Sequence, residues 1–387
     1  MTDSDPFADI RPYNDDEVRP VLDRLLADAE FVSAVAGLKF APWHRRLPWL
    51  VKPLVKWFLT RELKTVNSVL GFQHVVKQYM DHMIESRTSQ FTVSGLDKLD
   101  DEKNYLFLSN HRDIALDPAF VNYALYHNGF DTLRIAIGDN LLSKPYVSDL
   151  MRVNKSFIVK RSAKGPRQML ETSKHLAAYI RHSIQQENHS IWIAQREGRA
   201  KDGLDRTEPA IIKMLSLAQQ RKEEEFSDFI RDLHIVPVAI SYELDPCDGA
   251  KAQELYEKAT QGSYEKAEHE DVASIAMGID GEKGHVHVSF GEPLGVGFNS
   301  PDEVAAAVDR QVWANYVLHP SNFFAYKRLH GEYPEGAYSD QNQAFDANAL
   351  QDQERAFNAR IDALPEQHQG YALGIYANPI VSKKPKS

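Results

Sequence analysis

Cysteine is almost absent from this sequence, since Cys247 is the single one in 387 residues. One thiol cannot form an internal disulfide or a cysteine-based zinc site, so we expect a reducing compartment. Cys247 stands in a turn-like Asp-Pro-Cys-Asp-Gly run that lacks the surroundings of a reactive thiol. We therefore interpret Cys247 as structural or incidental, with a nucleophile as the alternative.

Long hydrophobic runs are also missing. The longest stretches without Asp, Glu, Lys or Arg are residues 311–326 and 367–382, and both are too polar to cross a bilayer. A transmembrane helix needs about 20 largely apolar residues. The N-terminus is acidic and has neither the basic nor the apolar region of a signal peptide. We therefore expect neither a membrane span nor a signal peptide.

Positive charge is in deficit, because the formal net charge is −10. General nucleic-acid binding is therefore not expected, and any attraction to phosphate requires a local basic patch. No Gly-x-Ser-x-Gly elbow and no dinucleotide-binding glycine motif occurs, which disfavours a serine hydrolase and a nucleotide-binding loop. His285 and His287 alternate along the chain without a third ligand at suitable spacing, so we expect no metal site.

What the sequence does contain, from about residue 90 to 295, is an alternation of short apolar runs and helical patterns. The predicted strands are residues 91–93, 105–108, 133–137, 157–159, 191–194, 235–240 and 286–290. The helices predicted between them are residues 118–126, 166–186 and 209–233. This alternation predicts an α/β fold with a mainly parallel or mixed sheet flanked by helices.

Three regions are predicted along the chain. Residues 1–89 are expected to be helical and to include an amphipathic helix at 18–34. Residues 90–298 are expected to form the α/β domain, with a surface helical insertion at 249–274, rich in Ala, Glu and Lys. Residues 299–387 are expected to be a helical and irregular extension that ends in a disordered tail.

The segment 105–120 contains the most informative pattern. A predicted strand is followed by Ser109-Asn110-His111-Arg112-Asp113 and then by Leu116-Asp117-Pro118. Asp is a good N-cap and Pro is favoured at the first helical position, so a helix is expected to start at Asp117-Pro118. His111 then lies in the loop at the C-terminal end of a strand, the edge of an open α/β sheet where ligands bind.

A carboxylate beside this histidine would give it a chemical function. The carboxylate fixes the tautomer of the imidazole and stabilises the imidazolium, so that the histidine can take a proton from an alcohol. The alternative is that Asp117 only caps the helix and His111 is an ordinary loop histidine. The segment alone does not decide between them.

Four motifs in order resemble those of the lysophospholipid/glycerolphosphate acyltransferase superfamily, whose first motif is His, four residues, Asp. The segments that carry the resemblance are Asn110-His111-Arg112 with Asp117-Pro118, then Ser156-Phe157-Ile158-Val159-Lys160-Arg161, then Gln195-Arg196-Glu197-Gly198-Arg199, and last Ile235-Val236-Pro237-Val238. Residues 288–294 resemble the closing strand and turn of that fold. The resemblance spans roughly residues 91–296 and implies a glycerolphosphate-acyltransferase-like fold.

Two departures from the family pattern stand out. Asp117 is six positions after His111 rather than five, so Asp113 is an alternative partner, although Pro118 favours Asp117. In the third motif, Arg199 follows Gly198 directly, which makes the motif one residue short. If the deletion falls at the variable position, Arg199 keeps the family's phosphate-binding role, which Lys201 can reinforce.

The resemblance implies a role for each matching residue. His111 would deprotonate the acceptor hydroxyl while Asp117 orients it, and no covalent acyl-enzyme is expected. The substrate phosphate would be bound by Arg161 and Arg199, because guanidinium offers a planar fork of donors; solvated surface arginines are the alternative. The residues expected to shape or support the site are Asn110, Glu197, Gly198 and Pro237.

Residues 38–64 combine basic and aromatic side chains. The basic residues are Lys39, Arg45, Arg46, Lys52, Lys56, Arg61 and Lys64, and the tryptophans are Trp43, Trp49 and Trp57. Such a segment is suited to the interface of an anionic membrane. The alternative is a helical hairpin that packs into the core. Pro42, Pro48 and Pro53 argue against one long helix, because each interrupts or starts one.

Together these observations predict a cytoplasmic acyltransferase that lies peripherally on the inner face of a membrane. The expected acceptor is lysophosphatidic acid or glycerol 3-phosphate, and the expected donor is acyl-CoA or acyl carrier protein, with no cofactor. Two alternatives stay open: an acyltransferase for another lysolipid or an amino-lipid, and a non-catalytic lipid-binding protein.

Overall fold

The computed structural model describes residues 5–142, 144–220, 223–267, 270–334, 345–346 and 348–383, with backbone only at 38–39 and 41–45. The predicted disordered tail at 384–387 lies outside these residues. The chain divides into two compact units. Unit 1 comprises residues 1–82 and 133–191, and unit 2 comprises residues 83–132 and 192–387. The region boundaries given above, at 89 and 298, stay predictions.

Seven strands form a mixed sheet in the order β1-β7-β6-β2-β5-β3-β4. Their bounds are β1 Gln90–Ser94, β2 Leu106–Ser109, β3 Arg134–Gly138, β4 Ser156–Val159, β5 Ile191–Ala194, β6 Ile235–Tyr242 and β7 His285–Phe290. The pairings are parallel for β1 with β7, β2 with β6, and β3 with β4, whereas β6 and β7 are antiparallel. The predicted fold class and all seven predicted strands are confirmed.

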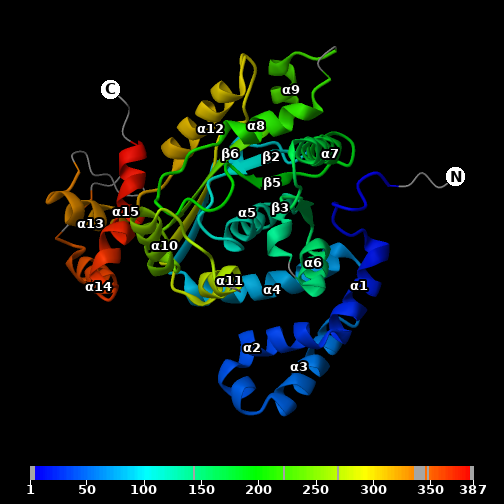
Figure 1. The fold of residues 1–387 in the computed structure, drawn as a ribbon, viewed down its shortest axis with the longest axis horizontal. Helices are drawn as coiled ribbons and strands as arrows, with labels where there is room; N and C mark the ends of the chain where they lie inside the picture. Colours follow the sequence, from blue (N-terminus) through cyan, green and yellow to red (C-terminus); the bar gives the residue numbers. More distant parts are fainter. Residues whose placement is uncertain are drawn as a thin grey trace. The chain divides into compact units, whose positions relative to one another are not determined.

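Unit 2 contains most of the helices that follow β5. Their bounds are α8 Pro209–Leu215, α9 Phe226–Asp232, α10 Asp248–Gln261, α11 Glu270–Asp280, α12 Pro301–Asn315, α13 Pro320–His330, α14 Gln351–Asp362 and α15 Glu366–Lys383; α5, Leu116–His127, precedes them. Helix α15 packs against α13, α14 and α10. Figure 1 shows α13 to α15 in orange to red and α10 in yellow-green. The predicted helical C-terminal extension is therefore present.

One helix prediction in unit 2 is wrong in detail. The helix expected at 209–233 is interrupted between α8 and α9, because the polar residues before Phe226 provide no apolar stripe to bury. The helical insertion expected at 249–274 forms α10 and part of α11. Helix α10 exposes positions such as Gln253 and Lys258 and buries one face of mixed polarity: Asp248, Lys251, Ala252 and Glu254.

Unit 1 begins with helices that share one core. Their bounds are α1 Asp15–Ala27, α2 Ala29–Arg46 and α3 Pro48–Glu62, followed by the start of α4 Val69–Arg87; α6 Pro145–Val153 and α7 Pro166–Gln185 come later. The single helix expected at 18–34 is wrong. The chain breaks at Asp28, whose carboxylate accepts hydrogen bonds from the backbone N–H groups of Glu30 (2.8 Å) and Phe31 (2.9 Å), and so caps α2.

Helices α2 and α3 lie side by side as a hairpin (Figure 1). Pro48 starts α3 as expected, but Pro53 lies inside the helix without ending it. A proline in a helix interior costs about 3 kcal/mol, whereas each buried aliphatic side chain contributes about 1.5–3 kcal/mol. Val51, Val55 and Leu59 are all buried in the unit 1 core, so packing outweighs the lost hydrogen bond.

Candidate functional site

The loop that leaves β2 places an imidazole against a carboxylate. β2 is buried along its whole length, and the chain continues through Asn110 to His111. The Nδ1 atom of His111 lies 2.8 Å from Oδ2 of Asp117, with side chains that are 14% and 0% exposed. The contact occupies Nδ1, so a proton taken from a substrate would go to Nε2.

Asp117 receives three further hydrogen bonds. The backbone N–H groups of Arg112 and Asp113 donate to Oδ2 at 2.5 Å and 2.9 Å, and the hydroxyl of Tyr242 donates to Oδ1 at 2.6 Å. Burial and the nearby carboxylates raise the pKa of Tyr242 well above its ordinary value, so the phenol stays a donor. These donors hold the carboxylate in one orientation, with Oδ2 facing His111.

The alternative partner, Asp113, has a different task. Its Oδ1 accepts hydrogen bonds from the backbone N–H groups of Ala115 (3.0 Å) and Leu116 (2.9 Å), where α5 begins. The expected helix start at Asp117-Pro118 is therefore slightly late, because Asp113 supplies the carboxylate that caps this end. Burial and the neighbouring Asp117 raise the pKa of Asp113. It is Asp117 that contacts His111.

A buried ion pair supports this loop. Arg112 donates to Oδ2 of Asp205 at 2.6 Å, and both side chains are about 5% exposed or less. Asn110, which is fully buried, donates to the same carboxylate oxygen at 3.2 Å and accepts from the backbone N–H of Ile240 at 2.8 Å. Asn110 therefore connects the end of β2 to β6, and so has the supporting role expected for it.

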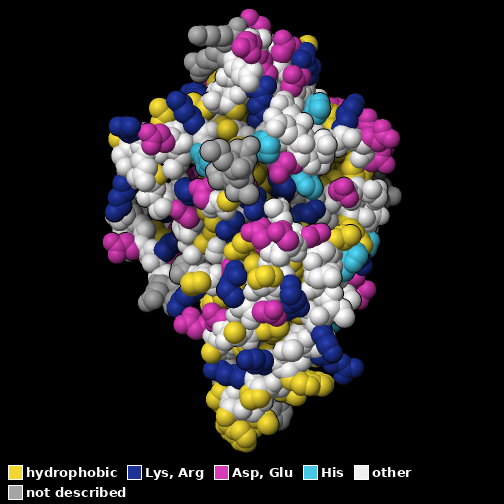
Figure 2. Space-filling model, turned by 90° about the vertical axis from the view of Figure 1, so that its right-hand side faces the viewer, with side chains coloured by type: hydrophobic (Ala, Val, Ile, Leu, Met, Phe, Trp, Pro, Cys, Tyr) yellow, Lys and Arg dark blue, Asp and Glu magenta, His cyan; other side chains and the backbone are white. Residues whose placement is uncertain are grey.

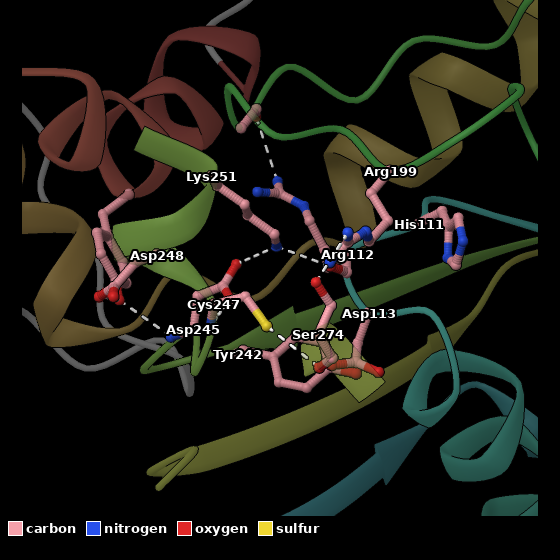
Figure 3. A network of polar contacts seen from close by, with 12 residues as sticks. His111, Arg112, Asp113, Arg199, Tyr242, Asp245, Cys247, Asp248, Lys251 and Ser274 are labelled. Carbon is pink, nitrogen blue, oxygen red and sulfur yellow. Dashed lines mark hydrogen bonds and ion pairs between the residues drawn. The ribbon is translucent and has the colours of Figure 1, made fainter. Parts of the chain in front are cut away.

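The third motif lies beside the histidine loop. The backbone N–H of Ala200 donates to the carbonyl of His111 at 2.8 Å, which joins the backbone of the third motif to that of the histidine loop; Figure 3 shows Arg199 and His111 in this region. Glu197 and Gly198 are exposed, and Gly198 has φ +74°, a conformation that favours glycine. Arg199 is half-buried and its guanidinium lies 3.5 Å from the hydroxyl of Ser274.

Lys201, expected to reinforce Arg199, is paired elsewhere. Its ammonium contacts the carboxylate of Glu254 on α10, and the two side chains are 14% and 5% exposed. Because Glu254 compensates the charge of Lys201, Lys201 is less suited than Arg199 to bind an anion.

The remaining predicted residues, Arg161 and Pro237, lie outside the His111 loop and the third motif. Arg161 follows β4 in unit 1, where its backbone N–H donates to Oδ1 of Asp139 at 3.0 Å, and its phosphate-binding role stays a prediction. Pro237 lies on β6 in register with Leu108 of β2, and its carbonyl accepts from the backbone N–H of Gly291 at 2.8 Å. Pro237 thus lies on the strand beside β2, and the loop that follows β2 carries His111.

The sequence did not identify three residues of this site. Tyr242 lies at the last position of β6, two residues beyond the predicted end of that strand. The ring of Trp192 on β5 contacts the imidazole of His111 edge to face, with 5.7 Å between centroids. Lys251 on α10 donates to the backbone carbonyl of Arg112 at 2.7 Å. A single aromatic residue in each of β5 and β6 is a weak signal for the first two.

Cys247, His285 and His287, for which no catalytic or metal-binding role was expected, have well-defined contacts. Burial raises the pKa of the Cys247 thiol to about 11, and its Sγ lies 3.5 Å from the carbonyl of Ser274. This environment opposes the thiolate that a nucleophile requires. His285 and His287 both contact the hydroxyl of Thr92, at 2.6 Å and 2.7 Å. Within the described part of the chain, no group of three or more His, Cys, Asp or Glu side chains is arranged to hold a metal ion.

Comparisons with known proteins agree with the motifs. The sequence profile of the family described as Acyltransferase matches residues 90–241. A glycerol-3-phosphate acyltransferase of Alteromonas mediterranea is 28% identical over 192 residues, which are 49% of this chain and 21% of that protein. This chain therefore spans only about a fifth of that relative. The crystal structure of the 1-acyl-sn-glycerophosphate acyltransferase PlsC from Thermotoga maritima aligns with a TM-score of 0.38 at 14% identity, over 76% of this chain and 94% of that one.

Proposed function

We propose that this chain, whose residues 90–241 match the acyltransferase family, transfers a fatty acyl group from a thioester to the hydroxyl of a glycerolphosphate acceptor. The single observation that carries the proposal is the 2.8 Å contact between Nδ1 of His111 and Asp117, with the loop of Arg199 joined to the histidine loop by the Ala200–His111 hydrogen bond. A general base next to a phosphate-binding guanidinium is the combination that this reaction needs.

In the proposed reaction, Nε2 of His111 removes the proton of the acceptor hydroxyl. The oxygen attacks the thioester carbonyl and forms a tetrahedral intermediate. The carbon–sulfur bond then breaks, and the imidazolium returns the proton to the departing thiolate. Asp117 stabilises the imidazolium throughout, and Tyr242 with the two backbone N–H groups keeps Asp117 in place. No acyl group is attached to the protein.

We propose lysophosphatidic acid or glycerol 3-phosphate as acceptor and acyl-CoA or acyl carrier protein as donor. Lysophosphatidic acid is favoured, because a membrane-docked protein meets a lipid substrate directly. Another lysolipid or an amino-lipid as acceptor is the second candidate, and a non-catalytic lipid-binding protein is the third. Retention of the His111–Asp117 contact disfavours the third, since a binding protein has no need of a general base.

An acceptor panel tests this function. The purified wild type and the variant Arg199→Ala receive glycerol 3-phosphate, several phosphate-bearing lysolipids and a phosphate-free lysolipid, with both donor types, and mass spectrometry identifies the products. We expect acylated phosphate acceptors from the wild type. Arg199→Ala should raise KM for phosphate acceptors about tenfold or more, because a charge-assisted hydrogen bond contributes about 1.5–3 kcal/mol. Equal losses on the phosphate-free acceptor would contradict the role of Arg199, and no product from any pair would contradict the function.

Exposed apolar side chains on α3 support membrane docking. Besides the buried face of α3, its other side exposes Trp49 (72%), Leu54 (57%) and Trp57 (59%). Arg61 lies over the Trp57 ring at 5.7 Å. In Figure 2 hydrophobic side chains gather, with Lys and Arg among them, at the lower end of the view, where Figure 1 places α2 and α3. Among the described residues, no helix combines the length and hydropathy of a membrane span. We propose that this α3 face rests on an anionic membrane surface.

Removing this face should weaken membrane binding. We expect the triple variant Trp49→Ala/Leu54→Ala/Trp57→Ala to lose at least about tenfold in affinity for anionic vesicles, because each buried side chain contributes about 1.5–3 kcal/mol. Vesicle sedimentation measures the loss. The control Val272→Ala/Val296→Ala/Val381→Ala removes similarly exposed residues of unit 2. Unchanged sedimentation of the α3 variant, or an equal loss in the control, would remove the docking proposal.

A further inference from the structure

A buried lysine of helix α10 reaches the histidine loop. Lys251 is 1% exposed on its side chain, and its ammonium contacts the carboxylate of Asp245 and donates to the carbonyl of Arg112 at 2.7 Å (Figure 3). The predicted insertion that contains α10 had no assigned role. This contact connects it to the residue that follows His111.

The Arg112 carbonyl belongs to a peptide group that also contacts the proposed catalytic carboxylate. The other end of that peptide is the N–H of Asp113, which donates to Oδ2 of Asp117 at 2.9 Å. A hydrogen-bond chain therefore runs from Asp245 through Lys251 and this peptide to Asp117 and His111. A cation on the carbonyl polarises the amide and strengthens its N–H as a donor, because chained hydrogen bonds reinforce one another in a low dielectric.

The other side of α10 is held by the C-terminal helices. Asp248, three residues before Lys251, accepts hydrogen bonds at 2.7 Å from both Nε of Arg360 on α14 and the hydroxyl of Tyr376 on α15. Arg360 also donates to the carbonyl of Asp245 at 2.8 Å, and the Asp245 N–H donates to the Tyr376 hydroxyl at 3.0 Å. The helices α14 and α15 thus fix the start of α10 and, one turn later, Lys251.

Packing alone does not require a charge at this position. Taking an ammonium out of water costs several kcal/mol, and well-packed apolar residues often replace a buried ion pair without loss of stability. Lys251 instead places its charge between Asp245 and a backbone carbonyl of the His111 loop. The arrangement orients a loop, which an apolar side chain of the same volume could not do.

We propose that Lys251 is a positioning residue for His111, acting through the Arg112–Asp113 peptide and Asp117, and that α14 and α15 hold it in place through Asp248. The proposal rests on the proposed acyl transfer only for its effect on turnover. In this arrangement the C-terminal helices α14 and α15 keep His111 and Asp117 aligned without contacting the substrate.

Steady-state kinetics of the double variant Asp245→Asn/Lys251→Met tests the effect on turnover. Removing both partners avoids an unpaired buried charge, and the amide oxygen introduced at position 245 can still accept from the backbone N–H of Cys247, as the Asp245 carboxylate does. We expect kcat to fall about 10-fold to 100-fold, since small misplacements of catalytic groups cost up to about 10² in rate, while KM for the acceptor changes less than about twofold. Lys266→Met, at an exposed lysine paired with Asp271, is the control and should keep wild-type kcat. Wild-type kcat in the double variant would overturn the proposal.

The tautomer of His111 provides a readout that does not depend on activity. Imidazole ¹⁵N chemical shifts, assigned with His111→Gln, should show one tautomer with the proton on Nδ1 in the wild type and a mixture of tautomers in the double variant. A single Nδ1–H tautomer in both proteins would overturn the proposal even if turnover fell. If the wild type acylates no acceptor, the proposed function fails, but this spectrum still decides the role of Lys251.

A third variant tests the contribution of α15. Tyr376→Phe removes the hydroxyl between Asp245 and Asp248, while Arg360 still donates to Asp248. We therefore expect a smaller loss of about 3-fold to 10-fold in kcat, with the same mixture of tautomers, since small misplacements of catalytic groups cost up to about 10² in rate. Tyr371→Phe on the same helix leaves the Asp248 contacts intact and is the matched control. Equal kcat values for the two phenylalanine variants would overturn the role of the C-terminal helices.

Discussion

Replacing His111 by alanine is expected to lower kcat by about 10²–10⁴-fold, the usual contribution of a general base. Without the imidazole, the proposed general base is lost, and the acceptor hydroxyl must attack with its proton still attached. The measurement is the steady-state rate with the best donor and acceptor of the panel. KM for the acceptor should change little, because the proposed phosphate contact with Arg199 does not involve His111.

The fold should tolerate this change. His111 lies in a loop, its side chain makes a hydrogen bond to Asp117 and a ring contact to Trp192, and Asp117 keeps three other donors. We expect Tm to change by a few degrees at most. His330→Ala, on the exposed end of α13, is the control for losing a histidine elsewhere in unit 2. Wild-type-like turnover in His111→Ala would end the proposed mechanism.

The sequence predicted the sheet well because its strands are short apolar runs between polar segments. β6 is buried at every position, and the predicted strand at 235–240 is only two residues short of it. The failures lie where one polar side chain sets a boundary. Asp28 divides a single amphipathic pattern into α1 and α2, because its carboxylate bonds to two backbone N–H groups, and periodicity does not report such local competition.

The site was predictable where its residues are close in sequence. His111 and Asp117 share one loop and one helix turn, so a family motif finds both. Tyr242 contacts the Asp117 carboxylate only because β6 lies beside β2. Lys251 contacts the His111 loop, at the carbonyl of Arg112, only because α10 follows β6. Sequence separations of 125 and 139 residues cannot be bridged by a local pattern. The α10 lysine instead looks like one of many charges on a polar helix.

Local competition also explains why the sequence alone did not decide whether Asp113 or Asp117 contacts His111. Both Asp113 and Asp117 stand near the start of α5, and a motif alone allows either to cap the helix or to hold the histidine. In the structure Asp113 bonds to the N–H groups of Ala115 and Leu116, which frees Asp117 to face the imidazole. The one-residue expansion of the His-to-Asp spacing is therefore compatible with the contact that the family motif implies.

Exchanging each aspartate for asparagine is expected to separate these roles. In Asp117→Asn the amide oxygen should occupy the place of Oδ2, where two backbone N–H groups donate, so the His111 tautomer is retained but the negative charge is lost. The imidazolium that forms during transfer then lacks its ionic partner. We expect kcat to fall about 10²-fold, within the range for general-base catalysis, with an unchanged His111 tautomer in the imidazole ¹⁵N spectrum.

Asp113→Asn is the matched control, and it is expected to increase stability. Asparagine can still accept from Ala115 and Leu116 through Oδ1, so kcat should stay within about threefold of wild type, as expected for a residue outside the proton transfer.

Burial and Asp117 raise the pKa of Asp113 above its unfolded value, so the folded protein binds this proton more tightly than the unfolded chain. The contribution of Asp113 to stability therefore falls as pH rises through that range, and the variant should gain stability relative to wild type from about pH 4 upward. Urea unfolding at several pH values measures this gain. A large loss of kcat in Asp113→Asn, together with wild-type turnover in Asp117→Asn, would show that Asp113 is the carboxylate that His111 uses.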